Sequence, residues 1–536
     1  MSSAPLVDAS CRRRAAVLLC IGSACVYLAA AHWVNLGSGA VFGDAFSRVA
    51  IANQVVASRD PSLADIGFVW SPLPILALLP LVVLADWWPA LLRDGFAANI
   101  VAALCMAGAV VVVWLTVRDA GAKRWAQVFF TASFALHPMV LAYGANGMSE
   151  AMFLLFCLLG MRALARWLQH HETRDLIGAG VHVGVAYFAR YEAVTSAAAV
   201  GALVAAVTLC RTSGSLRDRI PHVLGDGLTV AFPPLVAFVG WAAASWLIVG
   251  QPFEQFSSAY GNSAQVGIGV GIADPGRVAR QLALLTPALP VVLLAAWHRR
   301  DTRSLAPLIV CGGPLAFYTA TMSAGASFGW LRFLILAVPL TVLLASYCAA
   351  PASALQGSPC RWCASEAFRG VVAVVVVAAS IGSTCVVFTD PLLASDESAL
   401  VEMLTGHPRP DNPHAKQRFQ SARDAAVFLD DLNLPKGSVL LDSWEGYAIV
   451  TMSDNPSQFV LNVDRDFFAA HARPHALVDY LLVPGGSATA RLDAVNRNYP
   501  ELYDGGEPST TLIREFAGRR ITWRLYRLDH ATVAGS

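Results

Sequence analysis

The sequence predicts a polytopic α-helical membrane protein of about eleven transmembrane helices, followed by a soluble α/β domain. Three observations predict this fold class. Apolar residues make up 56% of the 536 residues and charged residues only 14%, whereas a soluble domain carries about 25% charged residues. Apolar runs long enough to cross a bilayer, about 20 residues each, recur up to residue 388. From residue 389 on, charged and turn-forming residues return.

The first apolar run, at 15–36, follows the three arginines Arg12, Arg13 and Arg14. We interpret it as an uncleaved first helix, because it is long for a signal peptide and many spans follow. The other predicted spans are centred on residues 96–117, 126–143, 151–168, 176–189, 193–210, 226–249, 281–297, 305–322, 333–350 and 370–388. Several are interrupted by Pro or Gly, which membrane helices tolerate.

One apolar stretch, residues 73–88, is not expected to span the membrane. It is short, holds Pro74 and Pro80, and would invert every later loop if it crossed. Cytoplasmic loops carry an excess of Lys and Arg. Without this span, the cytoplasmic segments hold 17 Lys and Arg and the external loops before residue 389 hold 7. We therefore expect an interfacial helix at 73–88, a cytoplasmic N-terminus and an extracytoplasmic C-terminal domain on the plasma (inner) membrane.

The predicted domains are a transmembrane domain at 1–388, which includes a first external loop at 36–92, a linker at 389–414, and an extracytoplasmic α/β domain at 415–536. Within the last, five β-like runs read SVLLD, QFVLNV, DYLLVP, TTLIREF and RITWRLYRL. No group of acidic and basic side chains suited to catalysis stands out in this domain. We therefore expect it to bind a substrate or to cover a site in the transmembrane domain, rather than to carry out chemistry.

Single residues of the α/β domain also receive predictions. Ser421 is expected to cap an amphipathic helix that runs through Leu432. A further helix is expected near residues 488–498, between two strands. Trp444 and Trp523 are interpreted as core residues rather than as sugar platforms.

Net charge and cysteines exclude some function classes. The net charge of +1 indicates no bulk attraction to nucleic acid. Most of the eleven cysteines lie in apolar runs, where cysteine behaves as a small hydrophobic residue. Cys360 and Cys363 form a lone pair without a second pair of ligands, so we interpret them as loop residues.

The first external loop carries an acid close to the membrane. Asp44 lies about eight residues beyond the first span, and the stretch behind it is amphipathic at helical spacing. A carboxylate on a helix that lies flat on the membrane is placed to meet a lipid headgroup and a water-borne acceptor together. The alternative is that Asp44 only caps its helix, which Asp does well.

Four further charged residues lie at the external ends of predicted spans. Glu150 opens the fourth helix, with Asn146 nearby, and in the alternative interpretation it only stabilises the helix dipole. Arg190 and Glu192 lie between two apolar runs, and Arg332 lies at the outer end of the tenth helix. Charges at membrane depth mark functional sites, and the arginine fork suits a phosphate. A snorkelling arginine or a simple Arg190–Glu192 pair remains the alternative.

In order and topology these features resemble the GT-C superfamily of membrane glycosyltransferases, which includes protein O-mannosyltransferases, lipid A aminoarabinose transferases and actinobacterial mannosyl- and arabinosyltransferases. The shared pattern is an early acid (Asp44), a Pro-containing WSPLPIL segment, a second acid (Glu150) in NGMSEAMF, an ARYEA turn and an outer arginine (Arg332). It covers roughly residues 15–350. Here Ala45 replaces the second acid of a common acid pair, and Glu150 stands where several relatives have Asp, which puts a bound metal in doubt.

The resemblance implies transfer of a sugar, mannose or arabinose, from a polyprenyl-phosphate donor to a hydroxyl of a cell-envelope glycan, glycolipid or protein, with inversion. It implies a catalytic Asp44, acting as general base, and a catalytic Glu150. The remaining expected roles are donor-phosphate binding by Arg190 and Arg332, and substrate orientation by Glu192 and Asn146. No metal ligands are assigned, and a need for Mg²⁺ or Mn²⁺ stays open.

The chief alternative is a transporter or flippase of lipid-linked sugars. Against it, the sequence shows no pair of interrupted helices in corresponding halves of the chain. Few charges lie inside the predicted spans.

Overall fold

The computed structural model describes residues 4–267, 274–299, 301–350, 365–485 and 488–529. The chain forms two compact units. The helical unit comprises Met1–Trp33, Asn99–Ala243 and Ile272–Val401, and the α/β unit comprises Val34–Ala98, Ala244–Gly271 and Glu402–Ser536. The first external loop and the C-terminal region therefore belong to one unit. Cys360 and Cys363 lie outside the described residues.

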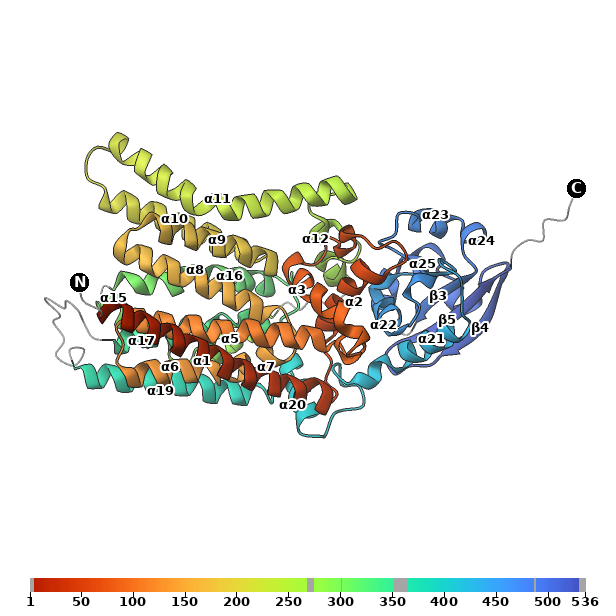
Figure 1. The fold of residues 1–536 in the computed structure, drawn as a ribbon, viewed down its shortest axis with the longest axis horizontal. Coiled ribbons are helices and arrows are strands. Elements are labelled where there is room, and N and C mark those ends of the chain that lie inside the picture. Colours follow the sequence, from red (N-terminus) through yellow and green to blue (C-terminus); the bar gives the residue numbers. More distant parts are fainter. Residues whose placement is uncertain (1–3, 268–273, 300, 351–364, 486–487, 530–536) are drawn as a thin grey trace, which may run out of the picture. The chain divides into compact units, whose positions relative to one another are not determined.

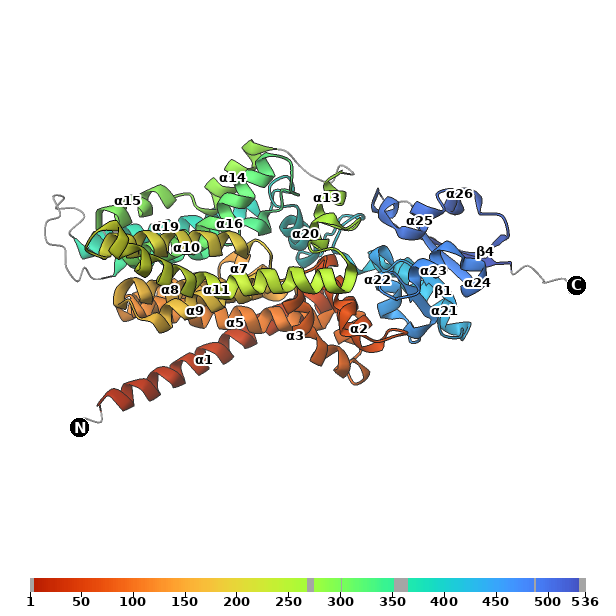
Figure 2. The same ribbon diagram turned by 90° about the horizontal axis from the view of Figure 1, so that it is seen from above.

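The helical unit is a bundle of long apolar helices that lie side by side (Figure 1). In Figure 2 the N-terminal part of α1 diverges from the other helices of this unit. Only 17% of the residues in the apolar stretch of this helix are buried inside the protein. The long helices and the bent pair are α1 (Ala4–His32), α5 (Phe96–Asp119), α6 (Arg124–Ala135), α7 (Pro138–Ala145), α8 (Glu150–His170), α10 (Ala193–Arg211), α11 (Leu216–Val249), α16 (Leu305–Ser323), α17 (Ala337–Ala349) and α19 (Glu366–Val387).

Among the described residues, eight helices are long and apolar enough to cross a membrane, or nine if α6 and α7 form one span bent by 55°. The bend lies at Pro138, which cannot continue the backbone hydrogen bonding of α6. The chain is thus a multi-pass membrane protein, but the predicted count of eleven spans is not confirmed.

Two predicted spans are not among these helices. α9 (Thr173–Ala189) has 17 residues, and the stretch expected at 281–297 is divided between α14 (Pro275–Leu285) and α15 (Leu289–Arg299). The division falls at Thr286 and Pro287, because proline lacks the amide donor that an unbroken helix needs. Residues 73–88, which we expect not to span, form the short helices α3 (Pro72–Val82) and η3 (Val83–Asp86).

The α/β unit contains all five predicted strands in one sheet of order β2-β1-β3-β5-β4. The strands β2 (Phe459–Leu461), β1 (Val439–Leu441) and β3 (Tyr480–Gly485) are parallel, with β2 at one edge of the sheet. β5 (Thr522–Leu528) pairs antiparallel with β3 and with β4 (Thr510–Phe516). The helical segment predicted near 488–498 is present as η9 (Ala488–Leu492) and α25 (Ala494–Asn498).

Hydrophobic clusters cover both faces of this sheet. One contains side chains of α21 (Gln420–Asp431), α22 (Ser443–Met452) and α2 (Gly43–Ala57), and the other those of α23 (Phe467–Ala472), α25 and α26 (Leu502–Gly505). Trp523 is only 1% exposed, so it is a core residue as expected. Trp444 is half-buried and stacks on Tyr260 at a ring separation of 5.3 Å.

The prediction that Ser421 caps α21 is wrong. The helix begins at Gln420, and Phe419 occupies the N-cap position without a side-chain cap. The chain is already helical before this point in η7 (Lys416–Phe419). The Ser421 hydroxyl instead donates a hydrogen bond to the Ile521 carbonyl at 2.8 Å. A contact with a distant segment therefore uses the hydroxyl that the local sequence pattern predicts to be a helix cap.

Candidate active site

The turn between α7 and α8 places the second predicted acid. Asn146 caps the end of α7, and its side-chain oxygen accepts the Met148 N–H at 3.1 Å. Gly147 adopts a φ of +81°, a conformation that glycine reaches without a steric penalty. The chain then re-enters a helix at Glu150, the first residue of α8, as predicted. Glu150 is fully buried.

Arg190 reaches Glu150 from the end of α9. Its Nη1 donates to the Glu150 carboxylate at 2.6 Å, and its Nε donates to the Glu192 carboxylate. Its Nη2 donates to the Tyr318 hydroxyl of α16 at 3.1 Å. The Arg190–Glu192 pair that the sequence allows is therefore real, but it is one part of a larger network.

Arg332 joins the same network from η6 (Leu331–Leu334). Its Nε lies 3.8 Å from the Glu150 carboxylate, and its Nη1 lies 3.4 Å from the Asp396 carboxylate. The side chain is buried and its guanidinium lies 4.0 Å from the centre of the Trp330 ring. Arg332 is therefore not a snorkelling arginine, because its charge is held inside the protein.

Aromatic rings surround the two guanidinium groups. Phe333 stacks on Tyr318 with 4.5 Å between ring centroids. The same Phe333 ring lies 5.4 Å from the Arg190 guanidinium and 5.6 Å from that of Arg332. Cation–π contacts of this kind stabilise arginine where water is scarce. The structure thus brings Glu150, Arg190, Glu192 and Arg332 together, as expected of one site.

Two further acids at this site are not predicted from the sequence. Asp396 and Glu397 lie on α20 (Ser395–Leu404), within the region predicted as a linker. Glu397 is buried and accepts a hydrogen bond from the Tyr143 hydroxyl at 2.5 Å. Burial, and then the neighbouring Asp396 charge, raise the pKa of Glu397 to about 7. The adjacent acids in ASDESAL, so close to the end of a span, were the available signal.

Asp44 belongs to the α/β unit. It lies in the first turn of α2, whose N-cap is Phe42, so the capping alternative is not observed. The Asp44 carbonyl accepts a hydrogen bond from Arg48 at 3.1 Å. Arg418 packs so closely that a Cβ on Gly43 would lie 2.5 Å from its Nη2. Glu150 and the two arginines belong to the helical unit, so convergence of Asp44 with them stays a prediction.

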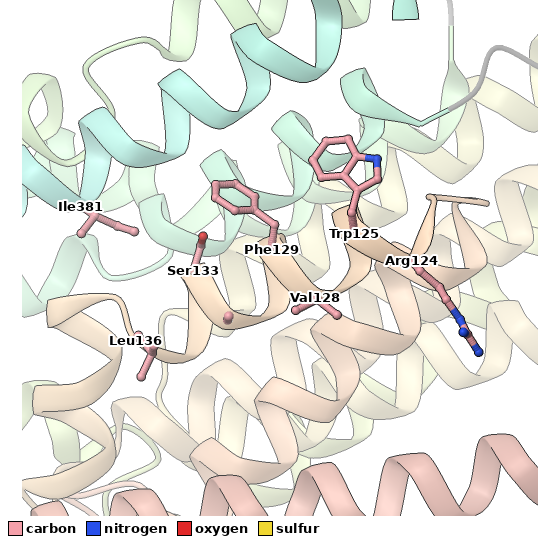
Figure 3. Close-up of a pocket in the computed structure, with 8 residues that line it drawn as sticks. Arg124, Trp125, Val128, Phe129, Ser133, Leu136 and Ile381 are labelled. Carbon is pink, nitrogen blue, oxygen red and sulfur yellow. The ribbon is translucent and has the colours of Figure 1, made fainter. Parts of the chain in front are cut away.

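A cavity of about 820 Å³ lies elsewhere in the helical unit, along α6 (Figure 3). In Figure 3 Trp125 and Phe129 extend to the same side of α6, and Arg124 points away from them. No carboxylate is among the residues that line it, which are Arg124, Trp125, Val128, Phe129, Ala132, Ser133, Leu136 and Ile381. It therefore offers no general base, and the candidate active site remains the Glu150 network.

The chain is similar to known proteins in part of its sequence and in its fold. A family model described as dolichyl-phosphate-mannose-protein mannosyltransferase matches residues 90–241, a segment that contains Asn146, Glu150, Arg190 and Glu192. A search of curated proteins finds no match. The crystal structure of ArnT from Cupriavidus metallidurans bound to undecaprenyl phosphate is similar with a TM-score of 0.53 and 14% identity, over 97% of this chain and 99% of that one.

The apo structure of the same ArnT is similar with a TM-score of 0.51 and 15% identity, over 95% of this chain and 97% of that one. The chain therefore has the fold of this ArnT. The fold that the sequence resemblance to the GT-C superfamily implies is thereby confirmed. Arg332, Asp396 and Glu397 lie outside the segment that the family model matches.

Proposed function

We propose that this chain is a membrane glycosyltransferase. It moves a sugar, mannose or arabinose, from a polyprenyl-phosphate donor to an acceptor hydroxyl on a cell-envelope glycan, glycolipid or protein. The reaction takes place on the extracytoplasmic face of the inner membrane. The observation that carries the proposal is the pair Arg190 and Arg332. Arg332 is buried and the Arg190 side chain is 12% exposed, and both share the carboxylate of Glu150.

The arginine pair suits a lipid phosphate for a physical reason. A guanidinium offers five N–H donors in a planar fork that matches a phosphate. At the moment of transfer the phosphate gains negative charge as the leaving group, and buried donors stabilise such charge more strongly than donors in water do. An incoming phosphate competes with Glu150 and Asp396 for these donors. The undecaprenyl phosphate in the ArnT crystal structure supports the same donor class for this chain.

The acceptor hydroxyl needs a base, and we assign this role to Asp44. Attack by the hydroxyl on the anomeric carbon displaces the lipid phosphate directly, so the carbon inverts and a single base suffices. Asp44 stands near the start of the first external loop, where the membrane-held donor and the acceptor meet. Glu150 is the second catalytic candidate, and its contacts with both arginines make it the residue that sets their positions. Asn146 and Glu192 orient the substrate.

None of the proposed steps of the transfer reaction uses a metal ion. Within the described residues, no group of three or more His, Cys, Asp or Glu side chains is arranged to hold a metal. The carboxylates nearest the arginines are instead engaged by guanidinium or hydroxyl groups, as in Glu150–Arg190 and Glu397–Tyr143.

The test is transfer by the purified full-length protein in lipid nanodiscs. Undecaprenyl-phosphate donors carrying radiolabelled mannose or arabinose are offered together with a cell-envelope fraction as acceptor. We expect label to move from the lipid carrier into a new glycosidic linkage, and Arg332→Ala to abolish the transfer. Arg280→Ala serves as the matched control, because Arg280 is an exposed arginine of α14.

Transport without chemistry would give a different result. A flippase would move the intact labelled lipid across the bilayer and form no new linkage. Failure of the wild-type protein to transfer either sugar would reject the glycosyltransferase assignment.

A further inference from the structure

The turn that joins α7 to α8 carries three buried polar atoms without partners. Asn146 Nδ2, Ser149 Oγ and Glu150 Oε2 form no hydrogen bond with any other part of the chain that the structure describes. The three residues are 2%, 4% and 0% exposed. A buried polar atom without a partner is destabilising, and native structures contain few of them. Three on one short turn indicate a binding site for a polar ligand.

The remaining polar atoms of the turn fix its geometry. Asn146 Oδ1 accepts the Met148 N–H at 3.1 Å, which leaves Nδ2 as the outward donor. Glu150 Oε1 receives Arg190 Nη1 at 2.6 Å, which leaves Oε2 as the free acceptor. Ser149 occupies the N-cap position of α8, yet its hydroxyl makes no cap hydrogen bond. Serine in that position ordinarily bonds to the backbone of its own helix, so this hydroxyl is held for another partner.

The chemistry of the three atoms defines the ligand class. Nδ2 of an amide only donates, a carboxylate oxygen only accepts, and a serine hydroxyl does both. A ligand that satisfies all three must present both donors and acceptors within a short distance. Vicinal hydroxyl groups of a sugar ring meet this requirement, whereas a lipid tail or a bare phosphate does not.

We infer that this turn, defined as Asn146, Ser149 and Glu150, is a binding subsite for the hydroxyl groups of the sugar on the lipid-linked donor. The inference rests on the proposed function, because it takes the arginine pair as the phosphate site. Glu150 connects the two, since one of its oxygens faces Arg190 and Arg332 and the other belongs to the turn. A sugar attached to a phosphate at the arginines lies next to this turn.

The subsite is tested by comparing two ligands that differ only in the sugar. Binding of undecaprenyl phosphate and of undecaprenyl-phosphate-mannose is measured on the full-length protein in nanodiscs, without acceptor. Ser149→Ala should weaken binding of the mannose-bearing lipid by about 3- to 10-fold, the value of one hydrogen bond, and leave the bare lipid unchanged. Arg332→Ala should weaken both.

The matched control is Thr131→Val. Thr131 on α6 also has a buried hydroxyl without a partner among the described residues, but α6 contributes no residue to the turn. This variant should bind both lipids as the wild type does. The unfolding temperature of Ser149→Ala is measured in parallel, and it should not fall, because the change removes an unsatisfied polar group rather than a contact.

The outcomes separate the subsite from the function on which it rests. If wild-type protein binds neither lipid, the proposed donor class fails. If it binds both but Ser149→Ala weakens them equally, or weakens neither, the turn does not contact the sugar and the inference is overturned. In the transfer assay with acceptor, an effect of Ser149→Ala confined to the KM of the acceptor would assign the turn to the acceptor's hydroxyls and overturn the donor assignment.

Discussion

At the scale of single residues, the site depends on one carboxylate shared by two arginines. Glu150 faces Arg190 at 2.6 Å and Arg332 at 3.8 Å, and all three belong to different segments of the helical unit. A buried charge pair is weak evidence for stability, because desolvation offsets the attraction. Since a buried network of this kind lies at the ends of apolar helices, a functional role explains it better than a structural one.

Asp44→Asn is the decisive change for the proposed base. Asparagine keeps the size of the side chain and most of its hydrogen bonding but removes the basicity. Turnover should fall by about 10²–10⁴-fold, and donor affinity should remain nearly unchanged. A capping role is already excluded because Phe42 is the N-cap of α2. Steady-state transfer rates and donor affinities of Asp44→Asn measure both effects. A fully active Asn variant would show that Asp44 is not the general base.

Arg332→Lys tests the geometry of the phosphate site. Lysine keeps the charge but loses the planar fork and the flat contact with the Trp330 ring. Donor affinity should therefore fall, by roughly tenfold or more. The measurement is the dissociation constant for undecaprenyl phosphate, with the exposed Arg280→Lys as control. Equal affinities in Arg332→Lys and wild type would show that only the charge matters.

Glu397 makes stability depend on pH. Its pKa is raised by burial to about 7 from an ordinary value of 4.5, so between these values the folded state binds more protons than the unfolded state. Stability should therefore decrease as pH rises from about 4.5 to 7. Glu397→Gln should flatten this part of the curve, because glutamine does not titrate.

Thermal unfolding of both proteins in nanodiscs across this pH range tests the effect. The exposed Glu501→Gln serves as control and should follow the wild type. An unchanged slope in Glu397→Gln would show that other buried acids, such as Asp442 or Asp493, whose pKa values burial also raises, account for the dependence.

At the scale of elements, two long segments that connect helices, Val34–Ala98 and Ala244–Gly271, are part of the α/β unit. The first external loop pairs with the C-terminal region through the isolated bridge of Ala40 and Ala415. Phe46 of α2 packs edge-on against Phe419 at 5.2 Å. The segment after α11 is anchored by Tyr260, whose hydroxyl donates to Asp442 at 2.7 Å. Three segments distant in sequence thus share one structural unit, and Asp44 is positioned by it.

Tyr260→Phe should loosen the anchored segment. Phenylalanine keeps the stacking on Trp444 but removes the hydrogen bond to a buried carboxylate, which costs about 1.5–3 kcal/mol. Hydrogen exchange at α12 (Glu254–Ser257) and α13 (Asn262–Gln265) should become faster. Tyr480→Phe is the control, since this half-buried tyrosine of β3 has no side-chain hydrogen bond among the described residues. Unchanged exchange in Tyr260→Phe would mean that stacking alone holds the segment.

At the scale of the whole molecule, the number of spans remains the open question of topology. Charge asymmetry, with 17 Lys and Arg in the predicted cytoplasmic segments against 7 outside, predicts a cytoplasmic N-terminus. The structure leaves α9 at 17 residues and divides the segment at Pro287. Whether neither, one or both of these segments cross decides whether the chain crosses the membrane nine, ten or eleven times.

Reporter fusions resolve this question. Fusions after Arg118 should report cytoplasmic and fusions after Thr389 external. A fusion after Thr212 should report cytoplasmic only if α9 crosses. If the Thr212 fusion reports cytoplasmic, a fusion after Arg303 should report cytoplasmic only if α14 and α15 together cross. An external signal at Thr212 or Arg303 would reduce the count, and a cytoplasmic signal at Thr389 would overturn the orientation.

The sequence by itself determined the fold class, the five strands and four of the site residues. Apolar runs and alternating patterns report burial directly, since helices and strands expose one face at a fixed period. Glu150, Arg190, Glu192 and Arg332 were found because charge at membrane depth is costly and therefore stands out. The resemblance to the GT-C superfamily followed from their order along the chain.

Only the tertiary structure decided which charges meet. That Glu150 bridges two arginines, that Asp396 and Glu397 join them, and that Ser421 bonds to Ile521 depend on segments separated by 40 to 254 residues. No local pattern reports such contacts, because a carboxylate in a polar stretch looks the same whether it is solvated or buried. Burial by distant segments is what turns these ordinary acids into members of a site.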